Sequence, residues 1–187
     1  MAKTDIQDAL RVIPIHPDDY HLHRFSWEGK YYFDKYLPMC ASSSCNIFET
    51  LSTSLQWVMC EKYQAAGMSH MLDDFFFIGP KQSVSFRDLQ KFMHIGSEAG
   101  IPIKQEKTVP PMTTITIYGI EVDSIALQCR LPQPKLVKIR SVLEQLKQRK
   151  KVKLRDLQSA IGPLNYACLV VVPGKAFLRR LIDLTCK

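Results

Sequence analysis

The chain has 187 residues, of which 46% are hydrophobic and 23% charged, a composition typical of a folded protein rather than a disordered one. No apolar run approaches the ~20 residues that a membrane-spanning helix needs, and the N-terminus lacks the apolar segment of a signal peptide. We therefore expect a soluble, intracellular protein of the cytoplasm or nucleus that is not secreted and has no membrane partner. Its length allows one good core plus a small appendage.

The net charge of +7 is distributed unevenly along the chain. From Arg130 onward there are 14 Lys and Arg and 3 Asp and Glu, a net charge of +11. The first 129 residues contain 11 Lys and Arg and 15 Asp and Glu, a net charge of −4. A basic C-terminal third suggests an anionic partner. A solvated helix face would give the same pattern, so charge alone leaves both interpretations open.

The cysteines and histidines do not indicate a metal site. The six cysteines form no CxxC pair and have no histidine at zinc-ligand spacing, which is typical of buried thiols in a reducing compartment. We interpret the five histidines as surface or packing residues, although His21 and His23 would share one face of a strand.

The first 67 residues predict a strand, a hairpin and a helix. Residues 2–8 are typical of a strand, and Glu28-Gly29 predicts a hairpin turn between two aromatic-rich runs. We expect the aromatic side chains of 25–36 to form core and a sheet face rather than a platform for stacked bases. The serines at 42–44 are expected to cap a helix, because their hydroxyls accept from free N–H groups, and this helix should end near Gly67.

The middle of the chain alternates strands and helices. Asp73-Asp74 lies between two short apolar runs, which predicts a tight hairpin with the acidic pair at its turn. The apolar spacing from Ser85 to Ala99 predicts an amphipathic helix closed by Gly100. The β-branched run from Ile115 to Val122 predicts one further strand. This order predicts an α+β fold, an antiparallel sheet with helices on one face.

Beyond residue 131 the pattern becomes helical and basic. Apolar residues at helical spacing predict three helices, the second stopped by Gly162-Pro163 and the third following Pro173-Gly174. We therefore place a boundary near residue 131, which gives a first domain at 1–131 and a small basic helical module at 132–187.

Asp5, Asp73 and Asp74 are the residues best suited to metal chemistry. Adjacent acids between apolar flanks are unusual, because two carboxylates about 4 Å apart repel by roughly 4 kcal/mol at an effective dielectric constant of about 20. A bound cation removes that repulsion, and carboxylate oxygens suit Mg²⁺ or Mn²⁺. Asp5 also follows a short strand, and three carboxylates around two metal ions would support phosphoryl transfer. From the Asp73-Asp74 pair alone, a turn without a metal stays an alternative.

Segments in a fixed order along the chain resemble the motifs of reverse transcriptases. They are Lys3-Thr4-Asp5-Ile6-Gln7-Asp8-Ala9, Leu37-Pro38-Met39 with Ser42-Ser43-Ser44-Cys45, Leu72-Asp73-Asp74-Phe75, Gln105-Glu106-Lys107-Thr108, and Tyr118-Gly119-Ile120-Glu121-Val122-Asp123. The ending, Gly162 to Ala167 with Val172 to Arg180, resembles the post-palm region of tyrosine-recombinase retrotransposons of the DIRS type. The likeness is collinear from Lys3 to about Leu184.

The resemblance implies a polymerase palm followed by the start of a thumb, with RNA-directed DNA polymerase activity. Such a nucleotidyltransferase adds deoxynucleotides to a primer 3′-hydroxyl on an RNA or DNA template. Asp5, Asp73 and Asp74 would hold two Mg²⁺ or Mn²⁺ ions, and Lys107 would act as general acid at the pyrophosphate.

The resemblance also implies binding surfaces for deoxynucleoside triphosphates and for a template–primer duplex. Ile6, Gln7, Leu10 and Cys40 would lie beside the incoming nucleotide. Tyr118 and Gly119 would support the primer end. The basic helices after residue 131 would follow the nucleic-acid backbone.

The chain departs from the family pattern at two positions. Leu10 stands where the family has an aromatic sugar gate, and Cys40-Ala41 stands where it has a glycine, so that a Cβ would crowd the approach of the backbone to the nucleotide. The chain also starts at the first motif, so we expect a fragment without fingers. Two alternatives follow: a catalytically degenerate palm that only binds nucleic acid, and an unrelated α+β protein with a basic helical tail.

Overall fold

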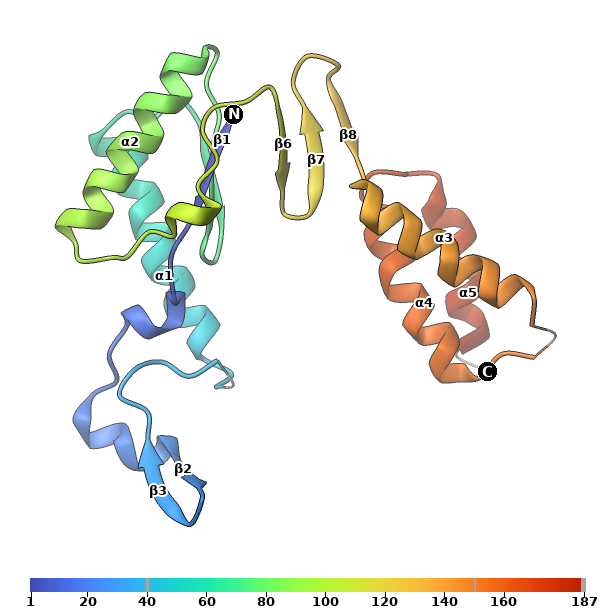
Figure 1. Cartoon of the computed structure of the whole chain (residues 1–187), viewed down its shortest axis with the longest axis horizontal. Helices are drawn as coiled ribbons and strands as arrows, with labels where there is room; N and C mark the ends of the chain where they lie inside the picture. Colours follow the sequence, from blue (N-terminus) through green and yellow to red (C-terminus); the bar gives the residue numbers. More distant parts are fainter. Residues whose placement is uncertain (40, 150, 186–187) are drawn as a thin grey trace. The chain divides into compact units, whose positions relative to one another are not determined.

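A computed structural model describes residues 1–39, 41–149 and 151–185 (Figure 1). The chain divides into two compact units, Met1–Thr113 and Thr114–Lys187. The paired strands are antiparallel in both units, and the predicted α+β fold class is confirmed. In the described part of the chain, no helix is both long and apolar enough to cross a membrane.

Unit 1 is built on a sheet in which β5 lies between β1 and β4. Its strands are β1 (Ala2–Asp5), β2 (Arg24–Trp27), β3 (Lys30–Phe33), β4 (Met68–Met71) and β5 (Asp74–Phe77). Its α-helices are α1 (Ser44–Trp57) and α2 (Gln82–Glu98). Short helical segments lie between them: η1 (Ala9–Val12), η2 (Pro17–His23), the π-helical turn η3 (Val58–Lys62) and η4 (Gln105–Lys107). The predicted acidic hairpin is β4–β5, and the predicted amphipathic helix is α2, followed by Gly100 at a φ of +68°.

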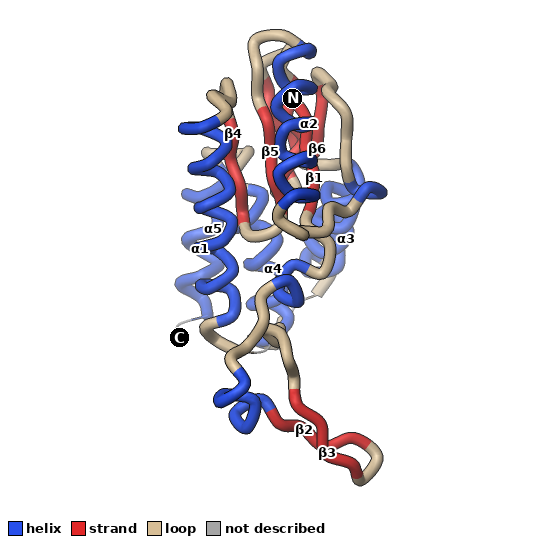
Figure 2. The backbone as a smooth tube through the Cα atoms, turned by 90° about the vertical axis from the view of Figure 1, so that its left-hand side faces the viewer, coloured by secondary structure: helices blue, strands red, loops and turns tan. Residues whose placement is uncertain are grey.

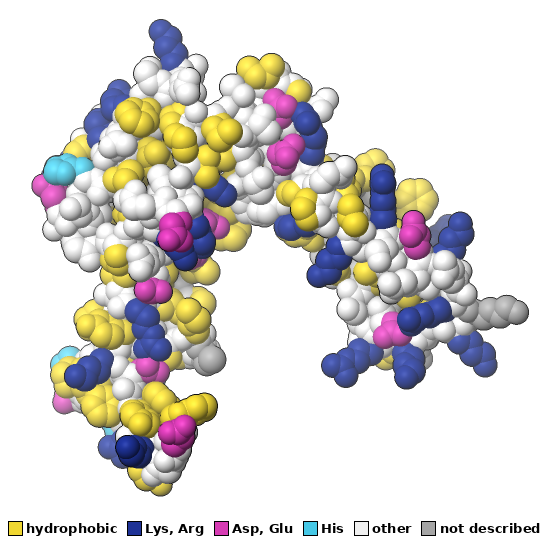
Figure 3. Space-filling view, viewed as in Figure 1, with side chains coloured by type: hydrophobic (Ala, Val, Ile, Leu, Met, Phe, Trp, Pro, Cys, Tyr) yellow, Lys and Arg dark blue, Asp and Glu magenta, His cyan; other side chains and the backbone are white. Residues whose placement is uncertain are grey.

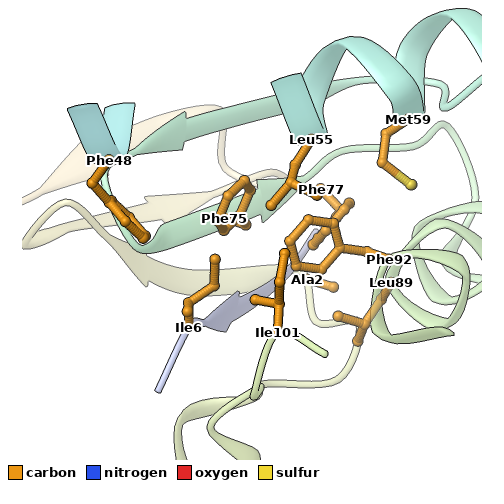
Figure 4. Packing of buried hydrophobic residues seen from close by; sticks show 10 residues of the cluster. All are labelled: Ala2, Ile6, Phe48, Leu55, Met59, Phe75, Phe77, Leu89, Phe92 and Ile101. Atoms are coloured by element: carbon orange, nitrogen blue, oxygen red, sulfur yellow. The ribbon is translucent and has the colours of Figure 1, made fainter. Parts of the chain in front are cut away.

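Both helices cover one face of the β1–β5–β4 sheet. Phe75 and Phe77 point to the same face of β5 because strand side chains alternate, and both are fully buried. Phe92 of α2 packs on them, with ring centroids 4.5 Å from Phe75 and 5.5 Å from Phe77. From α1, Phe48 and Leu55 enter the same cluster (Figure 4). Helix α2 runs alongside β1 and β5 (Figure 2).

The start and end of α1 differ from the prediction. The serine cluster does lie at the helix start, but the Ser43 side chain makes no capping hydrogen bond. Ser43 has a helical φ of −83° and ψ of −19°, whereas a capping side chain needs an extended backbone to reach the free N–H groups. At its other end α1 stops at Trp57 and continues only as the η3 turn to Lys62, short of Gly67.

The β2–β3 hairpin turns at Glu28-Gly29, as predicted, with φ values of +48° and +73°. Its aromatic side chains lie on both faces of the hairpin, and the expectation that they join the core is wrong for both strands. All eight residues are exposed, Tyr31 by 85% and Trp27 by 65%, because this two-stranded sheet lies outside the core cluster of the described residues. Hydrophobic side chains are visible at the surface there (Figure 3).

Unit 2 combines a three-stranded sheet with a helical module. The sheet has the order β6 (Thr114–Ile117), β7 (Ile120–Asp123), β8 (Gln128–Arg130), and the helices are α3 (Gln133–Lys147), α4 (Leu154–Ala167) and α5 (Gly174–Thr185). The helices line an apolar pocket of about 360 Å³ that is open to solvent, and its lining includes Leu136, Leu164 and Leu178.

Two local predictions for unit 2 are wrong. The expected single strand from Ile115 to Val122 is a hairpin, because Tyr118 and Gly119 adopt φ values of +50° and +74° and reverse the chain. The second helix, α4, does not stop at Gly162-Pro163 but continues to Ala167. Packing of α4 against α3 and α5 outweighs the loss of one helical hydrogen bond at Pro163.

The compact units divide the chain at Thr113, earlier than residue 131. The sheet of 114–130 groups with the helices because Tyr166 of α4 and Lys135 of α3 donate hydrogen bonds to its first turn. The division into a palm-like domain at 1–131 and a basic module at 132–187 stays a prediction about function.

Candidate active site

Asp5 and Asp74 lie opposite each other at the ends of two paired strands. In the register of β1 with β5, Asp5 is the partner of Asp74, and the Asp5 side chain is nearly fully buried. The backbone N–H of Ile6 donates to the carbonyl oxygen of Asp73 at 3.0 Å, which ties the end of β1 to the β4–β5 turn. Strand pairing therefore brings two of the three sequence-predicted carboxylates together.

The surroundings of Asp74 disfavour a negative charge. Burial raises the pKa of the Asp74 carboxyl above its ordinary value of 3.8, as do a hydrogen bond with Asp5 and the negative charges of Asp5 and Asp73. The positive charge of the Lys3 ammonium lowers the pKa of Asp74, but by less than the other effects raise it. A proton or a bound cation would relieve this repulsion.

Lys107 supplies a positive charge at this site. Its Nζ donates to Oδ2 of Asp5 at 2.7 Å, across 102 positions of sequence. This hydrogen bond raises the pKa of the Lys107 ammonium, with further contributions from the charges of Asp5, Asp73 and Asp74. Lys107 is brought here because the chain runs beside β1, where Lys104 N–H donates to the Asp5 carbonyl at 2.8 Å.

The donor chemistry of Asp5 and Asp74 fits a hard divalent cation, since both present carboxylate oxygens. The contact of Lys107 with Asp5 shows that a cation can be held against this carboxylate. Over residues 1–39, 41–149 and 151–185, however, no three His, Cys, Asp or Glu side chains are grouped to hold a metal ion. Coordination by all three aspartates therefore needs side-chain positions other than those seen.

The residues predicted to face the nucleotide are engaged in the fold. Ile6 is 1% exposed, and its N–H is bonded to Asp73. The side chain of Gln7 is exposed, but its N–H donates to the carbonyl of Pro102 at 2.8 Å. Leu10 packs against the hydrophobic core. Cys40 lies outside the described residues.

Sequence reasoning missed the side chains of α1 that hold the β4–β5 turn. Oε2 of Glu49 accepts from the N–H of Leu72 at 3.1 Å, and Oγ of Ser52 donates to the Leu72 carbonyl at 2.8 Å. His70 of β4 lies against Oε1 of Glu49 at 3.1 Å. The only signal in the sequence is that Glu49 is the single acidic residue of α1.

Tyr118 and Gly119, the predicted primer contacts, form the tip of the β6–β7 hairpin in unit 2. Tyr166 OH donates to the Tyr118 carbonyl at 2.6 Å, and Lys135 Nζ donates to the Gly119 carbonyl at 3.1 Å. Lys135 Nζ also lies 4.1 Å from the centre of the Tyr166 ring. We call the hydrogen bonds from Tyr166 and Lys135 to this turn the clamp. A Cβ on Gly119 would come within 2.2 Å of Lys135 Nζ, so the clamp requires glycine at this positive φ.

Replacing Tyr166 by phenylalanine should destabilise unit 2 by about 1 kcal/mol, because it removes the hydrogen bond to Tyr118 and leaves a carbonyl without that donor. Native-state hydrogen exchange of the β6–β7 amides measures this free energy of opening. Tyr31→Phe, the same change at a residue that is 85% exposed, is the matched control and should have no effect. Equal exchange in both variants would contradict the clamp.

Replacing Asp74 by asparagine should raise the free energy of unfolding at neutral pH. The pKa of Asp74 is raised in the folded state, so the folded protein binds this proton more tightly, and Asp74 lowers stability as the pH rises above 3.8. The gain in the variant should vanish below pH 3.8, where the carboxyl is protonated in both states. Urea denaturation at several pH values measures it, with the exposed Asp19→Asn as control.

The comparisons with known proteins find a likeness in structure only. No protein-family model and no curated protein sequence matches the chain. The foamy viral protease-reverse transcriptase dRH in complex with double-stranded DNA is similar over 89% of this chain and 27% of its own, with a TM-score of 0.74 and 23% identity. The foamy viral protease-reverse transcriptase with an RNA/DNA hybrid is similar over 96% of this chain and 24% of its own, with a TM-score of 0.74 and 22% identity.

A structure of native Prototype Foamy Virus protease-reverse transcriptase is also similar, with a TM-score of 0.60 and 18% identity. The chain spans about a quarter of the length of these structures, 24% to 27%. At such identities the likeness concerns the fold, which is reverse transcriptase-like.

Proposed function

We propose that the chain is a piece of an RNA-directed DNA polymerase from a retroelement of the DIRS type. The single observation that carries this proposal is the position of the buried Asp5 beside Asp74, at the ends of two paired strands. The motif order in the sequence and the reverse transcriptase-like fold support it. The DIRS assignment rests on the sequence of the ending alone.

Asp5, Asp73 and Asp74 would hold two Mg²⁺ or Mn²⁺ ions, which supply activation of the primer 3′-hydroxyl and neutralise charge on the leaving pyrophosphate. Burial of Asp5 keeps competing water away from this carboxylate. Lys107 carries a proton on Nζ at neutral pH and would donate it to the departing pyrophosphate as general acid after leaving Asp5, because the contact with Asp5 raises its pKa and opposes the transfer.

The nucleic-acid partner would be a template–primer duplex. The region from Arg130 onward carries a net charge of +11, and Lys and Arg side chains stand out from the helices of unit 2 in Figure 3. The similar foamy viral structures contain double-stranded DNA or an RNA/DNA hybrid. Contacts from lysine and arginine to phosphates carry little sequence information and weaken as salt rises.

A second candidate function is nucleic-acid binding without catalysis. Two observations favour it. Leu10 packs against the core, and the ammonium of Lys107 binds the Asp5 carboxylate at the place where a metal ion would bind. In that case Asp5 and Lys107 would form a structural ion pair, and the basic helices alone would carry the function.

Primer extension separates the two candidates. The chain is incubated with an RNA template, a DNA primer, deoxynucleoside triphosphates and Mg²⁺, and the products are sized. We expect extension that is lost in Asp73→Asn, while duplex binding, measured by fluorescence anisotropy at two salt concentrations, is retained. Salt-sensitive binding without extension would favour the second candidate and contradict the first.

A further inference from the structure

The turn between β4 and β5 is held by side chains from α1 rather than by its own sequence. Leu72 occupies the left-handed region at a φ of +53°, which a bulky non-glycine residue rarely adopts. Both backbone polar groups of Leu72 are bonded to α1: its N–H to Glu49 and its carbonyl to Ser52. These two hydrogen bonds stabilise a backbone conformation that the residue itself disfavours.

Glu49 is itself held in place. Its Oε1 contacts Nε2 of His70, whose side chain is only 9% exposed and whose other ring nitrogen bonds Gln56 of α1. The imidazole also stacks on the buried Phe75, with ring centroids 5.6 Å apart. The carboxylate that accepts from Leu72 is therefore fixed by groups on both sides, although 43% of the Glu49 side chain is exposed.

The position of this turn determines where the acidic residues lie. Asp73 and Asp74 directly follow Leu72, and the carbonyl of Asp73 accepts from Ile6, the residue after Asp5. A shift of the turn would therefore disturb the hydrogen bond between Ile6 and Asp73. It would also change the distances from the carboxylates of Asp73 and Asp74 to that of Asp5. We propose that Glu49 and Ser52 are positioning residues that set the spacing of the three carboxylates; this rests on the proposed function.

The test compares Glu49→Ala with Glu49→Gln in the full chain. Glutamine keeps an oxygen that can accept from Leu72, whereas alanine removes it. Glu61→Ala, at an exposed position of the η3 turn, is the matched control because the Glu61 side chain does not bond Leu72. Mn²⁺ affinity is measured by electron paramagnetic resonance, and kcat and KM by primer extension, at temperatures where all variants are folded.

We expect Glu49→Ala to weaken Mn²⁺ binding and to lower kcat by about 10- to 100-fold, the effect of removing a residue that orients a metal ligand, with the KM for primer unchanged. Glu49→Gln should restore most of both. Ser52→Ala should act in the same direction as Glu49→Ala. If the wild-type chain binds Mn²⁺ and extends a primer, and Glu49→Ala then matches Glu61→Ala in Mn²⁺ affinity and in kcat, the positioning role is wrong.

Hydrogen exchange at the Ile6 amide keeps this test separate from the test of function. Ile6 donates to Asp73, so a displaced turn should speed its exchange in Glu49→Ala even if the wild-type chain neither binds Mn²⁺ nor extends a primer. In that event the proposed function fails, and faster exchange at Ile6 still supports the positioning role. Unchanged exchange at Ile6 together with absent metal effects overturns it.

Discussion

Replacing Asp5 by asparagine is expected to abolish Mg²⁺-dependent primer extension, with a fall in rate of at least about 10³-fold, the scale on which single charge-stabilising groups act in phosphoryl transfer. Asparagine has nearly the same shape, so it fits the buried position opposite Asp74, but it lacks the negative charge that binds a metal ion and pairs with Lys107. Single-turnover extension of a labelled primer on an RNA template measures the rate.

Asp8→Asn is the matched control for this change. Asp8 lies three positions further along, is exposed, and has a φ of +49°, a conformation that asparagine also adopts readily. Its extension rate should stay within a few-fold of wild type. Equal activity of Asp5→Asn and Asp8→Asn would show that Asp5 holds no catalytic metal ion and that its pair with Lys107 is structural.

Replacing Phe92 by alanine should destabilise unit 1 by about 3–5 kcal/mol, because a large buried aromatic side chain is lost and its neighbours cannot fill the cavity. Phe92 is 1% exposed and contacts both Phe75 and Phe77, whose rings lie on the core face of β5. Such a loss is a large fraction of the stability of a small domain. Urea denaturation followed by circular dichroism measures it.

Phe86→Ala provides the comparison within the same helix. Phe86 is 49% exposed on α2 and lies outside the core cluster, so its removal takes away less buried contact than that of Phe92. We expect a change well under half that of Phe92→Ala. Similar losses for the two variants would mean that the α2 helix as a whole, rather than the aromatic contact with β5, dominates the effect.

The sequence by itself determined the elements whose pattern is local. Helical spacing predicts α2 closely, and Glu28-Gly29 predicts the β2–β3 turn, because side-chain periodicity and positive-φ turn residues act over a few positions. The same local reasoning failed at Tyr118-Gly119 and at Pro163. There, hydrogen bonds to the turn from α3 and α4 and the packing of the helices prevailed over the strand and helix-breaking patterns.

For the candidate site, the sequence identified the acidic residues but not what holds them. The motifs select Asp5, Asp73, Asp74 and Lys107, yet the pairing of Asp5 with Asp74 is a matter of strand register, and the contact of Lys107 with Asp5 spans 102 positions. The hydrogen bonds of Glu49 and Ser52 with Leu72 likewise connect two elements that are distant in sequence. Only the tertiary structure decided these contacts, because periodicity shows which way a side chain faces, whereas packing of one element on another decides which partner it meets.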